Sequence, residues 1–215
     1  MCEENILNSK LPRFFLKITP CVGMIIPKNE ENSYWIPNQI MQLAPFGSGT
    51  KNYDYFHKIE DYLYFRGDDN SFVTFTQIKS KGQIVYGRGA THPITNAIYP
   101  EMLIGCIKDF IPFAKKIYTH FEYTNKIIFT ICLANVEGKC AATSEGFRSE
   151  RAVDALPKEF KITGDVEIST AEVEVNRIDL DFIETNCLRP FFNKVGLTAL
   201  KEIPETFKNI IRDAI

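Results

Sequence analysis

Short apolar runs of aromatic and β-branched residues predict strands through the first half of the chain. The runs Phe72–Ile78 and Gln83–Tyr86 are separated only by the turn Lys79–Gly82, and this pattern predicts a β-hairpin. Shorter runs predict further strands, so we expect an antiparallel meander in this part of the sheet. These shorter runs are Phe14–Ile18 between Pro12 and Pro20, Tyr53–Lys58, and Tyr62–Phe65.

A change to helical spacing follows at Pro100, a residue that suits the first turn of a helix. Apolar residues then recur at steps of three or four and predict one amphipathic helix. They are Leu103, Ile107, Phe110, Ala114, Ile117 and Phe121. Pro112 lies inside this stripe and costs about 3 kcal/mol in a helix interior. Because the stripe continues past it, we expect one long kinked helix.

The segment Ile127–Val136 is almost continuously apolar, which is typical of a strand buried on both faces. Cys140–Ala142 is expected to return as its partner strand. Val166–Ile168 and Ala171–Val175 alternate in opposite phases, and a bulge near Ser169 and Thr170 reconciles them.

A second helix is expected from Asp179, an N-cap residue, to Gly196, a helix-ending residue, with Pro190 interrupting it. Its apolar stripe is Leu180, Ile183, Cys187, Phe191 and Val195. The tail Pro204–Ile215 predicts a short amphipathic helix, which either covers the core or binds a partner.

The remaining segments are more polar. Pro27–Asn38 predicts a loop, Ile36–Leu43 a short helix or strand, and residues 143–160 an exposed loop or short helix. The order of elements predicts an α+β fold with a largely antiparallel sheet, packed by one long kinked helix and by C-terminal helices. We expect residues 1–10 to form a frayed tail and residues 11–215 a single domain.

Composition supports a globular protein, with 45% apolar and 24% charged residues. The net charge is −2 and both signs are mixed along the chain, so direct nucleic-acid binding is not expected. The start Met1–Glu4 has no basic region followed by an apolar stretch. The longest apolar run is well short of the ~20 residues that span a bilayer. We therefore expect a cytoplasmic location without membrane contact.

No arrangement of residues predicts a catalytic or metal site, and no cofactor is expected. The six cysteines have no Cys-x-x-Cys spacing and are expected as reduced, mostly buried thiols. His120 is interpreted as a residue that favours the dipole at the end of the long helix. Asp165 and Glu167 share one strand face, where they are either metal ligands with Lys161 nearby or part of the solvent face.

Five polar residues are the candidate contacts to a ligand or a partner. The arginine fork binds carboxylates and phosphates, and the histidine follows the predicted hairpin in a glycine-containing loop. These residues are Arg66, Arg88, His92, Arg148 and Arg151. The alternative for each arginine is a solvated surface side chain, and for His92 a simple loop histidine.

The order of motifs resembles the region that follows the AlbA-type, Schlafen-related nucleic-acid-binding domain in bacterial ATP-binding or transcriptional regulator proteins. The matching stretches are Pro12–Pro20, Gln42–Gly47, the strand ending at Arg66–Gly67, the hairpin Phe72–Tyr86, Ile131–Gly138 and Leu188–Gly196. The AlbA-type domain itself is missing from these residues, so its nucleic-acid or nuclease role is not carried over. The resemblance implies a sensing, regulatory or assembly module of a regulatory or defence system.

Three functions follow as hypotheses. The first is a non-enzymatic binding or sensing module that works with a protein partner or with a separate nucleic-acid-binding domain. The second is a small hydrolase or nuclease whose site is assembled from distant loops. The third is a structural subunit that forms a homo-oligomer through its aromatic surface or its C-terminal helix.

Overall fold

The computed structural model describes residues 12–42, 54–57, 61–66, 74–90, 97–141 and 161–196. These residues form an α+β fold with an antiparallel sheet, which confirms the predicted class. The strands are β1 (Arg13–Pro20), β2 (Asp54–His57), β3 (Asp61–Arg66), β4 (Thr74–Lys79), β5 (Ile84–Gly89), β6 (Lys126–Ala134), β7 (Val166–Ser169) and β8 (Val173–Glu174). The helices are α2 (Glu30–Gln42), α3 (Pro100–His120), η2 (Val175–Arg177), α5 (Leu180–Ile183), η3 (Glu184–Leu188) and α6 (Arg189–Lys194).

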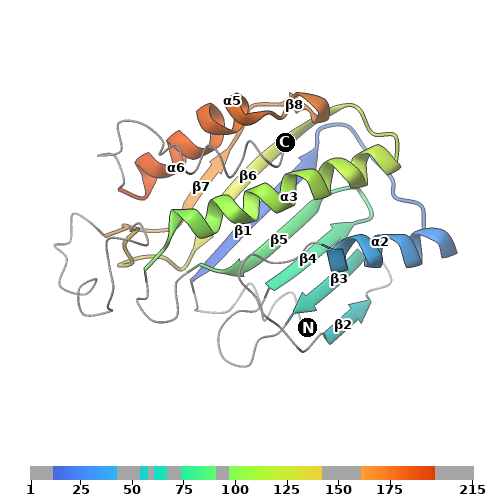
Figure 1. The fold of residues 1–215 in the computed structure, drawn as a ribbon, viewed down its shortest axis with the longest axis horizontal. Coiled ribbons are helices and arrows are strands. Elements are labelled where there is room, and N and C mark those ends of the chain that lie inside the picture. The colour runs from blue at the N-terminus through green and yellow to red at the C-terminus, as the bar shows by residue number, and fades with distance from the viewer. Residues whose placement is uncertain are drawn as a thin grey trace.

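The sheet has the order β2-β3-β4-β5-β1-β6-β7, and β8 pairs with β6 beyond the end of β7 (Figure 1). The first strand of the chain therefore lies in the middle of the sheet. Leu16 of β1 is opposite Tyr86 on one side and Ile131 on the other, and all three side chains are buried. This central register places β1 between the meander and the C-terminal half of the fold.

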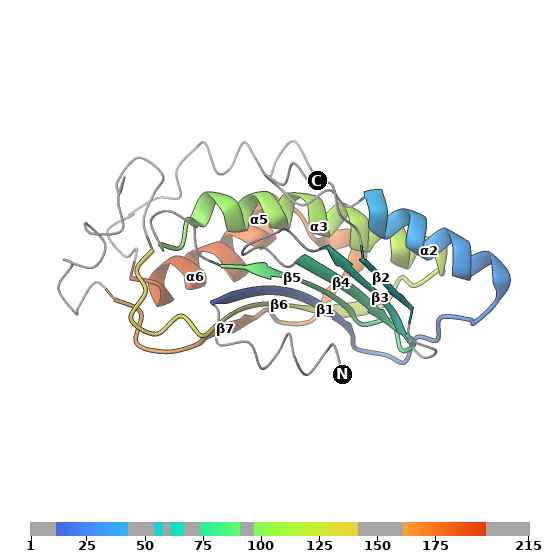
Figure 2. The same ribbon diagram turned by 90° about the horizontal axis from the view of Figure 1, so that it is seen from below.

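All four α-helices of the described chain lie on one side of the sheet (Figure 2). The core lies in this layer, where α3 packs over the central strands. Phe110 and Ile107 of α3 and Phe129 of β6 are at most 1% exposed. Tyr118 adds a polar tie, because its hydroxyl donates a hydrogen bond to the carbonyl oxygen of Gly82 over 3.0 Å.

The predicted hairpin is confirmed by the pairing of β4 with β5, in which Ile78 is opposite Ile84. Its turn is closed by a hydrogen bond of 2.8 Å from the amide of Gly82 to the carbonyl of Lys79. Gly82 has a φ of 80°, a conformation that glycine adopts without steric cost. The β5 strand extends to Gly89, so it includes residues that the sequence pattern predicts to be a loop.

The long helix is also confirmed, and it continues through Pro112 as a single helix. The kink expected at this residue stays a prediction.

The predicted bulge is confirmed by the register along β6. Thr130 is opposite Ser169 while Ile127 is opposite Val173, so three steps along β6 correspond to four along its partner. Thr170 lies in this bulge, and its hydroxyl accepts a hydrogen bond of 3.1 Å from the amide of Phe129.

The C-terminal helical segment follows the prediction in its cap and in four described residues of its stripe, which are the buried Ile183, Cys187, Phe191 and Val195. The Asp179 carboxylate accepts a hydrogen bond of 2.8 Å from the amide of Phe182, and Gly196 ends the segment with a φ of 81°. The π-helical turn η3 directly precedes α6, which holds Pro190. A wider turn relieves the clash between a proline ring and the carbonyl of the preceding turn. The segment therefore accommodates Pro190 without ending at it.

Two predictions were wrong. The segment Pro27–Asn38 was expected as a loop, but α2 begins at Glu30, where the Asn29 side chain accepts a hydrogen bond of 2.8 Å from the amide of Asn32. Ile36 and Ile40 are one turn apart and buried, and this burial offsets the cost of Pro37. The segment Cys140–Ala142 was expected as a partner of β6, but Ala141 forms a parallel bridge with Ile98 instead.

Several predictions lie outside the described residues. They are the tail 1–10, the loop 143–160 and the helix 204–215. Among the helices that the structure describes, none is both long and apolar enough to cross a membrane.

Candidate functional site

The structure describes two of the five residues predicted to contact a ligand or partner. Arg66 ends β3, and His92, Arg148 and Arg151 lie outside the described residues. Arg88 lies in β5 and is 5% exposed. Its side chain faces α3, where Nη1 lies 3.6 Å from the Cys106 Sγ atom and donates a hydrogen bond to it. Arg88 is therefore an interior residue, and its predicted contact to a ligand or partner stays a prediction.

The surroundings of Arg88 favour a neutral thiol. Burial raises the pKa of Cys106, and the neighbouring Arg88 guanidinium opposes this only in part. The Tyr86 hydroxyl lies 3.9 Å from the same sulfur, and burial raises the pKa of Tyr86 as well. Because a thiol reacts as a nucleophile in its ionised form, burial disfavours the reactive state of Cys106, and the contacts with Arg88 and Tyr86 offset this effect only in part. The cluster therefore acts as a buried polar contact between β5 and α3.

His120 packs against aromatic rings. Its imidazole stacks on Trp35 of α2 with ring centroids 3.7 Å apart and an angle of 12° between the planes. Phe121 meets both rings edge-on. These three residues, named here the ring cluster, connect the end of α3 to α2.

Asp165 and Glu167 are both exposed, and both lie near the Cys132 thiol. The Asp165 carboxylate accepts a hydrogen bond of 2.7 Å from the amide of Asn135, and Glu167 is exposed on β7. Burial, followed by the nearby charges of Glu167 and Asp165, raises the pKa of Cys132 to about 11. Within the described ranges, no group of three His, Cys, Asp or Glu side chains is arranged to hold a metal ion.

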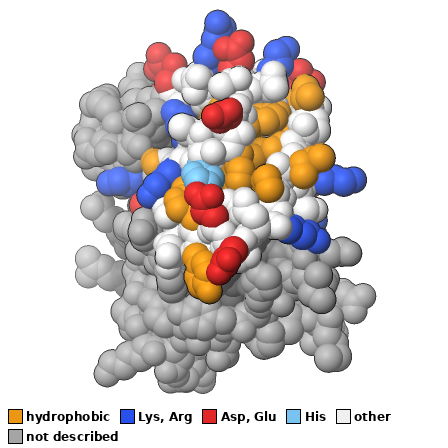
Figure 3. Space-filling model, turned by 90° about the vertical axis from the view of Figure 1, so that its right-hand side faces the viewer, with side chains coloured by type: hydrophobic (Ala, Val, Ile, Leu, Met, Phe, Trp, Pro, Cys, Tyr) orange, Lys and Arg blue, Asp and Glu red, His pale blue; other side chains and the backbone are white. Residues whose placement is uncertain are grey.

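Three large hydrophobic side chains are exposed in the described chain, and all belong to the stretch from the end of β1 to the first turns of α2. Val22 is 56% exposed, Ile25 81% and Tyr34 68%. We name these three residues the end surface. Figure 3 shows hydrophobic side chains gathered on this side of the molecule, where α2 begins and α3 ends. None of the predictions from the sequence includes this surface.

The backbone beneath the end surface is fixed by its neighbours. Met24 and Ile26 flank Ile25 and are 6% and 2% exposed. The amide of Ile26 donates a hydrogen bond of 2.9 Å to the carbonyl of Ser80 in the hairpin turn. A Cβ atom on Gly82 would lie 2.6 Å from the Met24 sulfur, so Met24 packs directly on that turn. Ile25 is therefore held outward because the residues on both sides are anchored inward.

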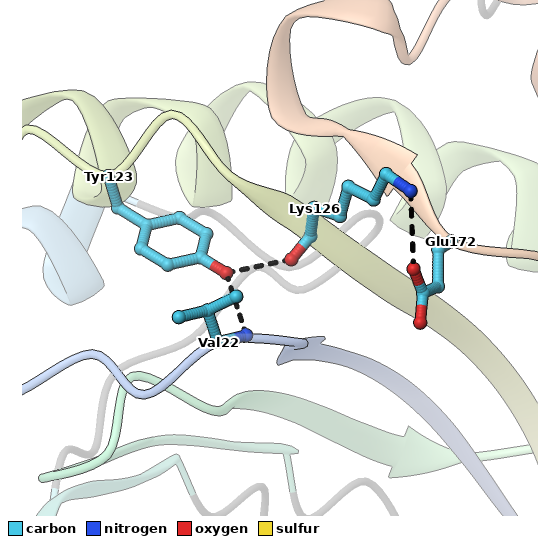
Figure 4. A network of polar contacts seen from close by, with 4 residues as sticks. All are labelled: Val22, Tyr123, Lys126 and Glu172. Carbon is cyan, nitrogen blue, oxygen red and sulfur yellow. Dashed lines mark hydrogen bonds and ion pairs between the residues drawn. The ribbon is translucent and has the colours of Figure 1, made fainter.

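A second set of contacts fixes the other end of this connection (Figure 4). The Tyr123 hydroxyl donates a hydrogen bond of 2.7 Å to the Lys126 carbonyl and accepts one of 3.4 Å from the Val22 amide. The Lys126 ammonium forms an ion pair of 3.4 Å with Glu172. The neighbouring amide of Cys21 also binds the Lys126 carbonyl, over 2.9 Å. Val22 is therefore presented to solvent from a hydrogen-bonded backbone.

One signal in the sequence could have indicated this surface. The stretch Cys21–Ile26 is apolar except for Gly23 and lies between Pro20 and Pro27. Such a run is more apolar than a surface connection requires. The pattern does not reveal which members face inward, because that depends on contacts with the hairpin turn.

Comparison of the chain with protein-family models, with curated proteins and with solved structures found no match. The function proposed below therefore depends on the fold and on the end surface.

Proposed function

We propose that this protein is a non-enzymatic binding module that docks a partner protein on the end surface. The observation that carries the proposal is the exposure of Val22, Ile25 and Tyr34 on one short stretch of chain. Apolar side chains scattered singly on a surface need no explanation, but neighbouring ones mark interaction sites.

Rigidity supports the same function. Binding costs free energy when loops and side chains become ordered, so a site that is already fixed binds more tightly. The anchors at Met24, Ile26 and Tyr123 hold this connection before any partner arrives. The adjoining ring cluster adds aromatic surface, which is enriched in the centres of interfaces.

The resemblance to the region that follows AlbA-type domains agrees with this function. It implies a sensing or regulatory module that works together with another domain or protein in a regulatory or defence system. The end surface supplies a place where such a partner would dock.

A capture experiment tests the proposal. The tagged protein is used to recover partners from cells that produce it, in parallel with the double variant Val22→Ser/Ile25→Asp. A Thr163→Asp variant is the matched control, because Thr163 is exposed near the start of β7, at the opposite end of β6 from Lys126. We expect at least one protein to bind the wild type and the control and to fall about tenfold or more with the double variant.

The double variant must first show the circular dichroism spectrum and urea midpoint of a folded protein. If every captured protein is retained equally by a folded double variant, the end surface is not the docking site.

A further inference from the structure

We infer that the stack of His120 on Trp35 is a pH-sensitive contact, which holds α2 to the end of α3 more strongly when the imidazole is protonated. Histidine is the side chain that ordinarily changes its charge between about pH 5 and pH 8. The His120 side chain is exposed and exchanges protons with solvent, whereas Trp35 is half-buried. The contact therefore joins a group that responds to pH to a helix that packs on the core.

The geometry of the two rings favours the charged form. Their centroids are 3.7 Å apart and the angle between their planes is 12°, so the imidazole lies over the face of the indole. The face of an aromatic ring carries negative charge density and attracts a cation within about 6 Å of its centroid. Indole is the aromatic ring that attracts cations most strongly. A proton on His120 therefore adds an attraction that two neutral rings lack.

The end of α3 favours the same state. His120 is the last residue of this helix and the basic residue of its last turn. The C-terminus of a helix carries a partial negative charge, which stabilises a cation placed there. The sequence predicted this interaction with the dipole, and the stack on Trp35 adds a second attraction for the same proton.

The charged side chains in this region have opposing effects. Three charged residues lie within one turn of the two rings along the chain, and these are Glu31, Lys116 and Glu122. The lysine has the sign that opposes a proton on His120, and the two carboxylates have the sign that favours one. The Tyr123 hydroxyl is bound to the Lys126 carbonyl. Among the described residues, no ion pair or hydrogen bond joins these groups to the imidazole, whose described contacts are aromatic.

The stack also bears on the end surface, because Tyr34 and Trp35 are consecutive residues of α2. Consecutive side chains point in different directions around a helix, so Trp35 contacts the end of α3 while Tyr34 is exposed. A contact that fixes α2 at low pH therefore fixes the orientation of Tyr34 as well. This consequence rests on the proposed function, whereas the pH-sensitive contact does not.

Fluorescence tests the contact directly, because the chain contains one tryptophan. A protonated imidazole that touches an excited indole accepts an electron from it and lowers its emission. We expect the emission of the wild type to fall between about pH 8 and pH 5, and this fall to be absent from His120→Gln. Glu31→Gln is the matched control, because it removes a carboxylate one turn from Trp35 and should keep the fall.

Urea unfolding of the wild type and of His120→Gln measures the strength of the contact. Protonation stabilises the folded contact, so this contribution is present at low pH and is lost as the pH rises. The unfolding equilibrium constant of the variant, divided by that of the wild type, should be about two- to fivefold larger at pH 5 than at pH 8. In a Trp35→Leu background the increase should be smaller, because only the helix dipole remains.

Three results would overturn the inference. They are a wild-type emission that stays constant over this pH range, a fall that persists in His120→Gln, and a ratio of unfolding constants that is equal at both pH values. None of these measurements needs a partner, so each result leaves docking on the end surface to be judged by the capture experiment alone.

Discussion

Apolar side chains are buried in one region of the molecule and exposed in another. The first region is the layer between the sheet and α3, and the second is the connection between β1 and α2. In the layer, rings such as Phe110 and Phe129 are at most 1% exposed. At the end, Ile25 is 81% exposed although it belongs to the same chain segment as the buried Met24 and Ile26. The contrast shows that a backbone can be anchored without burying every apolar side chain on it. Met24 and Ile26 fix the backbone, and Ile25 between them stays exposed.

The largest expected effect compares two adjacent residues. Met24→Ala should lower the free energy of unfolding by about 2–5 kcal/mol, because it removes a buried side chain that packs on the hairpin turn. Ile25→Ala should change it by about 0.5 kcal/mol or less, as for most surface substitutions. Urea denaturation of both variants measures the difference. A loss at Ile25 as large as that at Met24 would show that Ile25 serves the fold.

Gly87 lies at an interior position that has no room for a side chain. A Cβ on Gly87 would lie 2.3 Å from a Phe75 ring carbon and 3.0 Å from a Phe15 ring carbon. Gly87→Ala should therefore cost about 1–3 kcal/mol through displacement of the two rings. The control is Gly164→Ala, where the added Cβ meets nothing within 4 Å. Equal midpoints for the two variants in urea would contradict this packing.

The buried thiol of Cys187 should lower the free energy of unfolding at alkaline pH. Burial raises the pKa of Cys187 to about 12, whereas an unfolded thiol titrates near 8.5. The stability that Cys187 contributes is therefore fully present below about pH 8.5 and is lost as the pH rises toward 12, by at most about 1.4 kcal/mol per pH unit. We expect Cys187→Ala to show a smaller loss between pH 8 and pH 10 than the wild type. Cys21→Ser is the comparison, because Cys21 is exposed and its pKa is raised less than that of Cys187. Identical pH profiles for all three proteins would contradict the prediction.

The smallest expected effect concerns a helix cap. Asp179→Ala removes the acceptor for the Phe182 amide and should cost about 1 kcal/mol. Asp181→Ala, at an exposed position within the first turn, should cost only a few tenths of a kcal/mol through the helix dipole. Thermal unfolding of the two variants distinguishes a specific cap from a general loss of negative charge.

The sequence predicted the elements whose patterns are local. Neighbouring residues in the sequence determine three of these features. They are the apolar stripe of α3, the hairpin turn at Gly82 and the bulge after Ser169. The first half of α2 was missed because Pro37 and the polar residues before it are typical of a loop, whereas a helix was one of the two alternatives for Ile36–Leu43. The burial of Ile36 and Ile40 depends on elements far away in the sequence.

The candidate site was predicted less well than the fold. An arginine at a presumed strand end, Arg88, lies in the interior because β5 extends beyond the point at which the apolar pattern stops. The end surface was not predicted because inward and outward residues alternate within one apolar run. Only the contacts with Ser80, Gly82 and Tyr123 determine which members face solvent.

The most direct test of the central claim is photocrosslinking from the end surface in living cells. A photoreactive amino acid, p-benzoylphenylalanine, replaces Ile25 in one strain and Thr163 in another, and the cells are irradiated before the protein is purified. The account predicts a discrete higher-mass adduct from position 25 that contains a second protein and is absent from position 163. Adducts of the same kind and yield from both positions, or none from position 25 in a folded protein, would contradict it.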